Sequence, residues 1–251
     1  MKRTLVALLL WAAGSLAAAP AQSLTVSAAA SLKDALAAVN AAFTAAHPGI
    51  RVVVNYGASG ALQHQIEHGA PVDVFLSAAA RPMDALAARG LLLKGTRADL
   101  LSNTLVLIGP PGAKTPKDFP DLTSKGIRRI AIGEPKSVPA GQYAEEIFAH
   151  FGIAGAVAPK LVFAKDVRAV LTYTETGNVD AGVVYLTDAR HSKRATILAI
   201  APDGSHQPVV YPAAVIASSK HPEAARSYLG FLCSEEAATI FKSFGFDIPG
   251  R

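Results

Sequence analysis

Four short segments of the chain place a small or hydroxyl-bearing residue at the point where a strand or loop leads into a helix. Two of them present a serine, Ser31 after a run of alanines and Ser59 within a glycine-flanked turn. The other two are the runs Val138-Pro-Ala-Gly141 and Lys165-Asp-Val-Arg168. The first turn of a helix carries unpaired N–H groups and a partial positive charge, and together these bind anions. The four segments therefore point to anion binding by neutral donors.

Each segment also has an ordinary structural explanation when it is taken alone. Ser31 and Asp34 have the spacing of a capping box. Pro139 suits the first turn of a helix, and Asp166 is a typical helix cap. The functional interpretation depends on number and placement, because two segments lie in each half of the chain and ligands of doubly wound sheets bind at the carboxyl ends of the strands. From the residues alone we predict a two-lobed protein that binds an anion or another polar ligand.

Strand and helix patterns alternate along almost the whole chain. Residues 31–47 predict a helix, because the apolar side chains Leu32, Leu36, Val39 and Phe43 recur at helical spacing. Alternation of this kind predicts an α/β fold in which helices cover both faces of a sheet. The strands that we expect include residues 24–27, 50–54, 72–76, 105–108, 130–132, 183–185 and 209–217.

The chain contains no internal repeat and no flexible linker. A mature chain of about 230 residues is long enough for two lobes of roughly 100–120 residues each. We predict a first lobe of residues 22–103 plus 218–251 and a second lobe of residues 104–217, each a mostly parallel sheet flanked by helices. The chain would cross near Asn103 and near Ala217, and these crossings would form a hinge between the lobes.

Residues 1–21 have the features of a cleaved signal peptide. Lys2 and Arg3 precede an apolar run, and the segment ends in the cleavage pattern Ala19-Pro-Ala21. No cysteine lies at the expected cut after Ala21, so we expect an unlipidated, freely soluble protein in the periplasm. No later stretch reaches the length of a membrane helix.

Charge and cysteine content narrow the class of protein further. Loss of Lys2 and Arg3 lowers the formal net charge from +5 to 22 − 19 = +3. The basic residues are scattered rather than clustered, which argues against a nucleic-acid partner. Cys233 is the only cysteine, so no intrachain disulfide is possible and the core must provide the stability.

Five runs of the chain, residues 28–32, 69–75, 138–144, 166–168 and 182–185, follow one another over essentially the whole mature chain. In this order they resemble the runs of the periplasmic molybdate-binding proteins of ABC importers. The resemblance implies a two-lobed, periplasmic-binding-protein-like fold. It also implies a monomer that binds molybdate or tungstate and delivers it to a permease in the inner membrane. No cofactor and no free metal cation are implied, because the molybdenum is bound as the oxyanion.

The same resemblance implies a set of ligand-binding residues. Ser31 and Ser59 match two serines that donate hydroxyl and backbone N–H groups to the oxyanion. Ala140 and Val167 match residues that contribute backbone N–H groups, and Tyr185 matches a tyrosine whose hydroxyl completes the shell. Every group is a neutral donor, which suits an oxyanion that carries no proton at neutral pH. Protonated phosphate is disfavoured, because its own hydrogen would need an acceptor in the site. Sulfate carries no such hydrogen, so a sulfate-type or other oxyanion-binding protein remains an alternative.

Two enzymatic interpretations compete with transport. The run His64-Gln-Ile-Glu-His68 matches an inverted zinc-protease motif, so a zinc hydrolase using His64 and His68 is an alternative. We expect instead the polar face of a short helix, because no third ligand is identifiable. The run Gly57-Ala-Ser-Gly60 misses the nucleophile elbow of serine hydrolases by one position. Ferric-ion binding is disfavoured by the dispersed tyrosines, and we therefore expect a binding protein rather than an enzyme.

Overall fold

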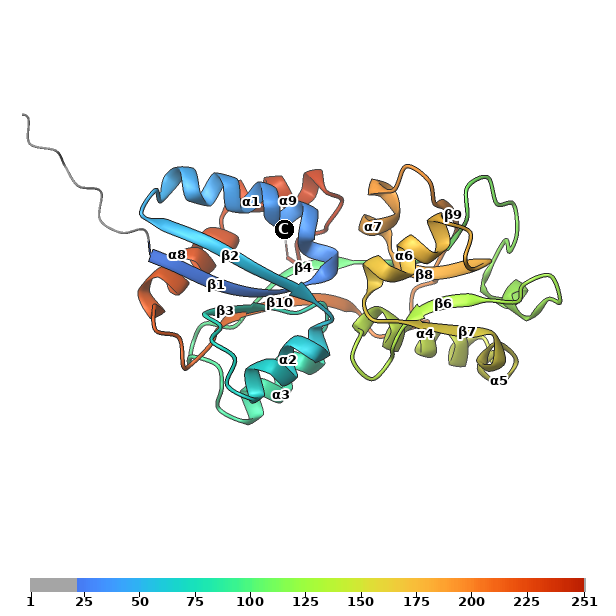
Figure 1. Ribbon diagram of the computed structural model, residues 1–251, viewed down its shortest axis with the longest axis horizontal. Helices are drawn as coiled ribbons and strands as arrows, with labels where there is room; N and C mark the ends of the chain where they lie inside the picture. The colour runs from blue at the N-terminus through green and yellow to red at the C-terminus, as the bar shows by residue number, and fades with distance from the viewer. Residues whose placement is uncertain (1–21, 251) are drawn as a thin grey trace, which may run out of the picture.

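Two sheet-based lobes lie side by side in the computed structural model of the chain (Figure 1), which describes residues 22–250. The predicted leader, residues 1–21, lies outside the described residues. Each lobe contains one five-stranded sheet with helices on both faces, so the predicted two-lobed α/β fold is confirmed. Within residues 22–250, no helix has the length and apolar character needed to cross a bilayer.

The first lobe has the strand order β2-β1-β3-β10-β4. Strand β1 pairs in parallel with β2 and β3, and β10 runs antiparallel to β3 and β4. Helices α1, α8 and α9 cover one face of this sheet, and α2 and α3 cover the other (Figure 1). The elements are β1 (Gln22–Ala29), β2 (Ile50–Gly57), β3 (Val74–Leu76), β4 (Ala98–Asn103), β10 (Val209–Val215), α1 (Lys33–Ala46), α2 (Ser59–Glu67), α3 (Ala80–Ala88), α8 (Pro222–Leu232) and α9 (Glu235–Ser243).

The second lobe repeats this plan with the strand order β7-β6-β8-β5-β9. Strand β6 pairs in parallel with β7 and β8, and β5 runs antiparallel to β8 and β9. Helices α6 and α7 lie on one face and α4 and α5 on the other (Figure 1). The elements are β5 (Leu105–Gly109), β6 (Ile130–Gly133), β7 (Leu161–Ala164), β8 (Ala181–Tyr185), β9 (Thr196–Ile200), α4 (Pro139–His150), α5 (Ala154–Val157), α6 (Val167–Glu175) and α7 (Leu186–His191), with short 3₁₀ turns at Phe119–Thr123 and Ala158–Lys160.

Both sheets are mixed, with two parallel and two antiparallel pairings each, where the sequence predicted mostly parallel sheets. The antiparallel strands are β5 and β10, which the chain enters directly from the other lobe. Neither is preceded by a helical crossover, and it is that crossover which makes a following strand parallel to the one before it.

The second crossing between the lobes differs from the predicted boundary at residue 217. The segment Val209–Val215 is strand β10 of the first sheet, so the chain returns between Ile200 and Val209. The apolar pattern of this segment predicts a buried strand but does not say which sheet it joins. The first crossing lies between Asn103 and Leu105, at the position that the sequence predicts.

The apolar stripe of the first helix packs as its spacing predicts. Helix α1 begins at Lys33, after a 3₁₀ turn at Ala30–Leu32, and ends before His47. Leu36, Val39 and Phe43 are fully buried against the sheet. This burial fixes the start of α1 at the carboxyl end of β1, where Ser31 lies.

Candidate functional site

The carboxyl ends of six strands, or the loops that follow them, meet at one small cavity between the lobes. It is lined by residues of the β1–α1, β2–α2 and β3–α3 connections in the first lobe and of the α4 and α6 starts and the β8 end in the second. Its volume is about 10 Å³, and a single water molecule needs roughly 10–15 Å³. The cavity in this closed form therefore holds about one water molecule, and a tetrahedral oxyanion would enter it only with a small separation of the lobes. All five residues that the resemblance implied line it: Ser31, Ser59, Ala140, Val167 and Tyr185.

Ser31 lies in the 3₁₀ turn that joins β1 to α1. The predicted capping box is wrong, because the serine hydroxyl caps neither helix start and Asp34 pairs with Arg168 instead. The Ser31 Oγ lies 3.1 Å from the Tyr211 hydroxyl, and the residue is buried. Tyr211 comes from β10, so the return strand to the first lobe supplies the partner of this serine.

Ser59 is the first residue of α2 and is fully buried. Its Oγ accepts a hydrogen bond of 2.9 Å from the backbone N–H of Ala78. An oxygen that accepts from an N–H group still has its own O–H to donate. The Ser59 oxygen is thereby held in place beside the cavity, with its hydrogen available to donate.

Ala140 and Val167 lie in the first turns of α4 and α6, where backbone N–H groups lack helical partners. Among residues 22–250, neither of their N–H groups donates to a backbone acceptor. Asp166 caps α6, as the sequence predicts, because its Oδ1 accepts the Ala169 N–H at 2.9 Å. Two helix N-termini thus present N–H groups and partial positive charge to the cavity.

Tyr185 ends β8 and is buried. Its hydroxyl donates to the Ala78 carbonyl of the first lobe over 3.4 Å, a long hydrogen bond. Burial raises the pKa of the tyrosine well above its ordinary value, with smaller contributions from neighbouring hydroxyl and carboxyl groups. The hydroxyl therefore stays protonated and can donate to a bound anion.

A chain of ion pairs crosses between the lobes beside the cavity. Arg168, next to Val167 on α6, contacts Asp34 of the first lobe at 3.1 Å and Asp188 of its own lobe at 3.2 Å. Asp188 is buried, and its Oδ2 has no hydrogen-bond partner among the described residues. Burial raises the pKa of Asp188 to about 7, partly offset by Arg168. Arg168 therefore links the two lobes.

The lobes also touch through their backbones at Gly60, directly after Ser59. The Gly60 N–H donates to the Ser137 carbonyl at 2.9 Å. A Cβ atom at this position would lie 2.8 Å from that oxygen and 2.9 Å from the Ser137 Cα. Only glycine permits this approach, which closes the lobes over the adjacent cavity.

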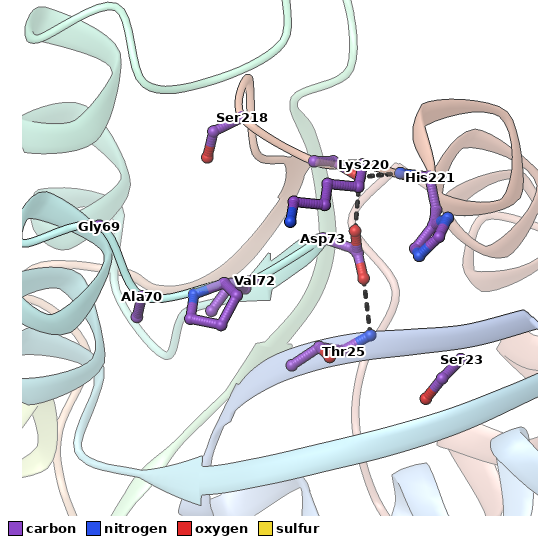
Figure 2. Close-up of a pocket in the computed structure, with 11 residues that line it drawn as sticks. Ser23, Thr25, Gly69, Ala70, Val72, Asp73, Ser218, Lys220 and His221 are labelled. Carbon is purple, nitrogen blue, oxygen red and sulfur yellow. Dashed lines mark hydrogen bonds between the residues drawn. The ribbon is translucent and has the colours of Figure 1, made fainter.

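A larger hollow lies at the other end of the first lobe (Figure 2), near the amino-terminal ends of β1 and β3. Its volume is about 460 Å³, and its lining includes Lys220 and His221. Asp73 lies between its walls and accepts hydrogen bonds from the Thr25 N–H at 2.7 Å and the Ser219 hydroxyl at 2.6 Å. Both carboxylate oxygens are occupied, so Asp73 holds the strands together.

His64 and His68 lie on the exposed side of α2 and its end, away from the cavity. The His64 Nδ1 lies 3.1 Å from the Glu67 carboxylate, and the His68 Nδ1 lies 2.7 Å from the His64 carbonyl. Within residues 22–250, no group of three or more His, Cys, Asp or Glu residues is placed to hold a metal ion. The described residues therefore add no third ligand to the zinc motif.

Sequence reasoning missed several residues that complete the site. Tyr211 contacts Ser31, Ala78 contacts both Ser59 and Tyr185, and Gly60 makes the closing contact. Tyr211 and Ala78 carry no local signal, because each acts through a neighbour distant in sequence. Gly60 was visible as part of a glycine-flanked turn, but its partner Ser137 was not.

Comparison with known proteins gives consistent matches along the chain. Residues 24–247 match the family model described as bacterial extracellular solute-binding protein. A Bacillus subtilis chain with the provisional name of an ABC transporter substrate-binding lipoprotein is 42% identical, over 89% of this chain and 86% of its own. The molybdate-binding protein ModA of Escherichia coli is 37% identical, over 90% of this chain and 89% of its own. The solved structure of the periplasmic molybdate-binding protein of Azotobacter vinelandii superposes with a TM-score of 0.81 at 27% identity, covering 90% of this chain and 99% of that one.

Proposed function

The chain belongs to the bacterial extracellular solute-binding proteins, and from this premise we propose that it captures molybdate between its lobes and delivers it to an ABC importer. The observation that carries the proposal is the set of neutral donors that converge from both lobes on one small cavity. Two serine hydroxyls, a tyrosine hydroxyl and two helix-start N–H groups line it. Relatives named as molybdate-binding proteins support the choice of anion.

The donor set favours a dianion that carries no proton. Charge-assisted hydrogen bonds from neutral donors and helix N-termini stabilise a buried oxyanion without a counter-cation. Asp166 is the single carboxylate in the lining, and one of its oxygens is already used to cap α6. A protonated phosphate would therefore bury its own hydrogen without a good acceptor, which costs about 1–3 kcal/mol.

The division of donors between the lobes supports selection by size. Ser31 and Ser59 belong to the first lobe, and Ala140, Val167 and Tyr185 to the second. An anion completes its shell only when the lobes close, so closure is driven by the higher affinity of the closed state. The smaller sulfate would leave donors of one lobe too distant, whereas tungstate has nearly the dimensions of molybdate and should bind as well.

The test is a calorimetric titration of the purified protein with molybdate, tungstate, sulfate and phosphate. We expect strong binding of the first two and a loss of at least about tenfold for each of the others, since one unpaired donor costs about 1–3 kcal/mol. Sulfate affinity equal to that of molybdate would move the assignment to a sulfate-type oxyanion carrier. Catalytic turnover has no part in the proposal, and binding should leave the anion unchanged.

Export is part of the same proposal. We propose cleavage after Ala21 and a soluble, monomeric, unlipidated protein in the periplasm. The Bacillus subtilis relative is named as a lipoprotein, so the lipidation state has to be measured on this chain itself. Intact-mass analysis of exported protein should give a chain that begins at Gln22, and a lipid adduct or a retained leader would contradict the proposal.

A further inference from the structure

A line of hydrogen-bonding side chains leads from the crossing between the lobes to the cavity. It begins at Asn103, the last residue of β4, continues to Tyr211 on β10 and ends at Ser31. The Asn103 Nδ2 lies 3.3 Å from the Tyr211 hydroxyl, and that hydroxyl lies 3.1 Å from the Ser31 Oγ. The three residues are far apart in sequence and meet only because β10 returns to the first sheet.

The direction of the first hydrogen bond is determined by the backbone. The Asn103 Oδ1 accepts the Thr104 N–H at 2.9 Å, and an N–H group can only donate. The amide is therefore oriented with its Nδ2 toward Tyr211 and toward the Thr187 Oγ1, which lies 2.9 Å away. Both Nδ2 hydrogens are donated, so the Tyr211 oxygen must accept.

The second hydrogen bond takes its direction from the first. Tyr211 is buried, and burial raises the pKa of its hydroxyl, so the O–H is retained. Since its oxygen accepts from Asn103, its hydrogen is available to the Ser31 Oγ, which lies 3.1 Å away. Ser31 then accepts from Tyr211, and its own hydrogen remains available to a ligand in the cavity.

We propose that Tyr211, oriented by Asn103, is a positioning residue that fixes the Ser31 hydroxyl as a donor to the bound oxyanion. The inference rests on the proposed function, since it assigns the direction of one hydrogen bond in that site. Ser59 has the same arrangement, because its Oγ accepts the Ala78 N–H. In one serine a backbone group determines the donor direction, and in the other a side-chain relay does.

The relay also determines what the site rejects. A free serine hydroxyl rotates and can accept a hydrogen bond as well as donate one, so it tolerates a protonated anion. A serine that already accepts from Tyr211 no longer rotates freely, and it offers a ligand in the cavity its hydrogen and one lone pair fewer. The relay therefore strengthens discrimination against hydrogen phosphate, in addition to supporting affinity.

The test is a double-mutant cycle of Tyr211→Phe and Ser31→Ala, measured by calorimetry with the tightest-binding of the four anions. Tyr211→Phe removes only the hydroxyl and should weaken binding about fivefold to tenfold, the value of one net hydrogen bond. In the Ser31→Ala background the same change should cost less than about twofold, because Tyr211 acts through Ser31. Tyr228→Phe is the matched control, since this buried tyrosine of the first lobe bonds Asn40 at 2.6 Å and does not line the cavity.

Each outcome of the cycle supports or overturns the proposed action of Tyr211 through Ser31. An equal penalty in both backgrounds would overturn the relay, and a penalty that disappears instead in Tyr185→Phe would show that the Tyr211 hydroxyl donates to Tyr185. A wild type that prefers sulfate would overturn the molybdate assignment and leave the relay to be judged with sulfate. If none of the four anions binds, both proposals fail.

A second variant tests the direction of the hydrogen bonds in the relay rather than their strength. Asn103→Asp replaces the donating amide with an acceptor, so Tyr211 would donate to the new carboxylate and Ser31 would turn its lone pair toward the ligand. The ratio of molybdate to phosphate affinity should fall by about tenfold or more, as one donor becomes an acceptor. The added charge weakens both anions, so the ratio isolates the direction. An unchanged ratio would contradict the proposed orientation of Ser31.

Discussion

Replacement of Gly60 by alanine should separate ligand affinity from the stability of the fold. The new Cβ atom would lie 2.8 Å from the Ser137 carbonyl oxygen, whereas ordinary contacts of this kind begin at 3.4 Å. The two backbones must therefore move apart by about 3.4 − 2.8 = 0.6 Å at a point one residue from Ser59. A donor across the cavity that starts near 2.9 Å would be left at about 3.5 Å, the limit of a useful hydrogen bond.

The expected loss follows from the donors that move out of reach. Each buried donor left unpaired costs about 1–3 kcal/mol, so Gly60→Ala should weaken molybdate binding by about tenfold to several hundredfold. The lobes themselves should fold at least as well, because alanine in a helix is favoured over glycine by up to about 1 kcal/mol. Calorimetry and the melting temperature of the ligand-free protein measure the two effects separately.

Gly230 provides the matched control for this variant. It lies within α8, and a Cβ atom added there meets nothing within 4 Å. Gly230→Ala should gain the same helical stabilisation and keep the wild-type affinity. If Gly60→Ala bound molybdate as tightly as Gly230→Ala, the closed contact between Gly60 and Ser137 would play no part in ligand capture.

Three further predictions test the donors, the buried carboxyl and the histidines. Ser59→Ala should weaken molybdate binding by about 1.5–3 kcal/mol, the value of a hydrogen bond to a charged group, and Ser31→Ala should do the same; unchanged affinity in both variants, measured by calorimetry, would remove the serines from the site. Burial raises the pKa of Asp188 from 3.8 to about 7, so the folded protein keeps a proton that the unfolded chain has released, and stability from this group falls as the pH rises through that window. The melting temperature of Asp188→Asn relative to wild type should therefore rise between pH 5 and pH 7 and level off above about pH 8, and a constant difference would show that Asp188 does not titrate there. The double variant His64→Ala, His68→Ala should keep full oxyanion affinity, whereas stoichiometric zinc lost with these two side chains would favour the hydrolase interpretation.

The sequence predicts those residues of the cavity well whose role can be recognised from adjacent residues in the chain. A helix start can be recognised from a few adjacent residues, so the segments that contain Ser31, Ser59, Ala140 and Val167 were all visible. The residues alone supported only an anion or polar-ligand binder, and the roles of these residues came from the family resemblance. The structure brings the four to one cavity because the carboxyl ends of β1, β2, β6 and β7 face each other across the two lobes.

The sequence fails where a contact joins distant segments. The spacing of Ser31 and Asp34 suggested a capping box, but Asp34 finds a stronger partner in the guanidinium of Arg168 in the other lobe. The pattern of residues 209–217 predicted a strand and placed it in the wrong lobe, since an apolar run does not reveal its neighbours. Tyr211, which lies on that strand, was missed for the same reason.

The central claim is that neutral donors of both lobes hold one oxyanion in the cavity between them. The most direct measurement is a crystal structure of the molybdate complex with anomalous scattering recorded at the molybdenum edge. We predict one strong anomalous peak, with its oxygens within hydrogen-bonding distance of the Ser31 and Ser59 hydroxyls, the Ala140 and Val167 N–H groups and the Tyr185 hydroxyl. A peak in the hollow beside Asp73 and His221, or at the α2 surface near His64, would contradict the account.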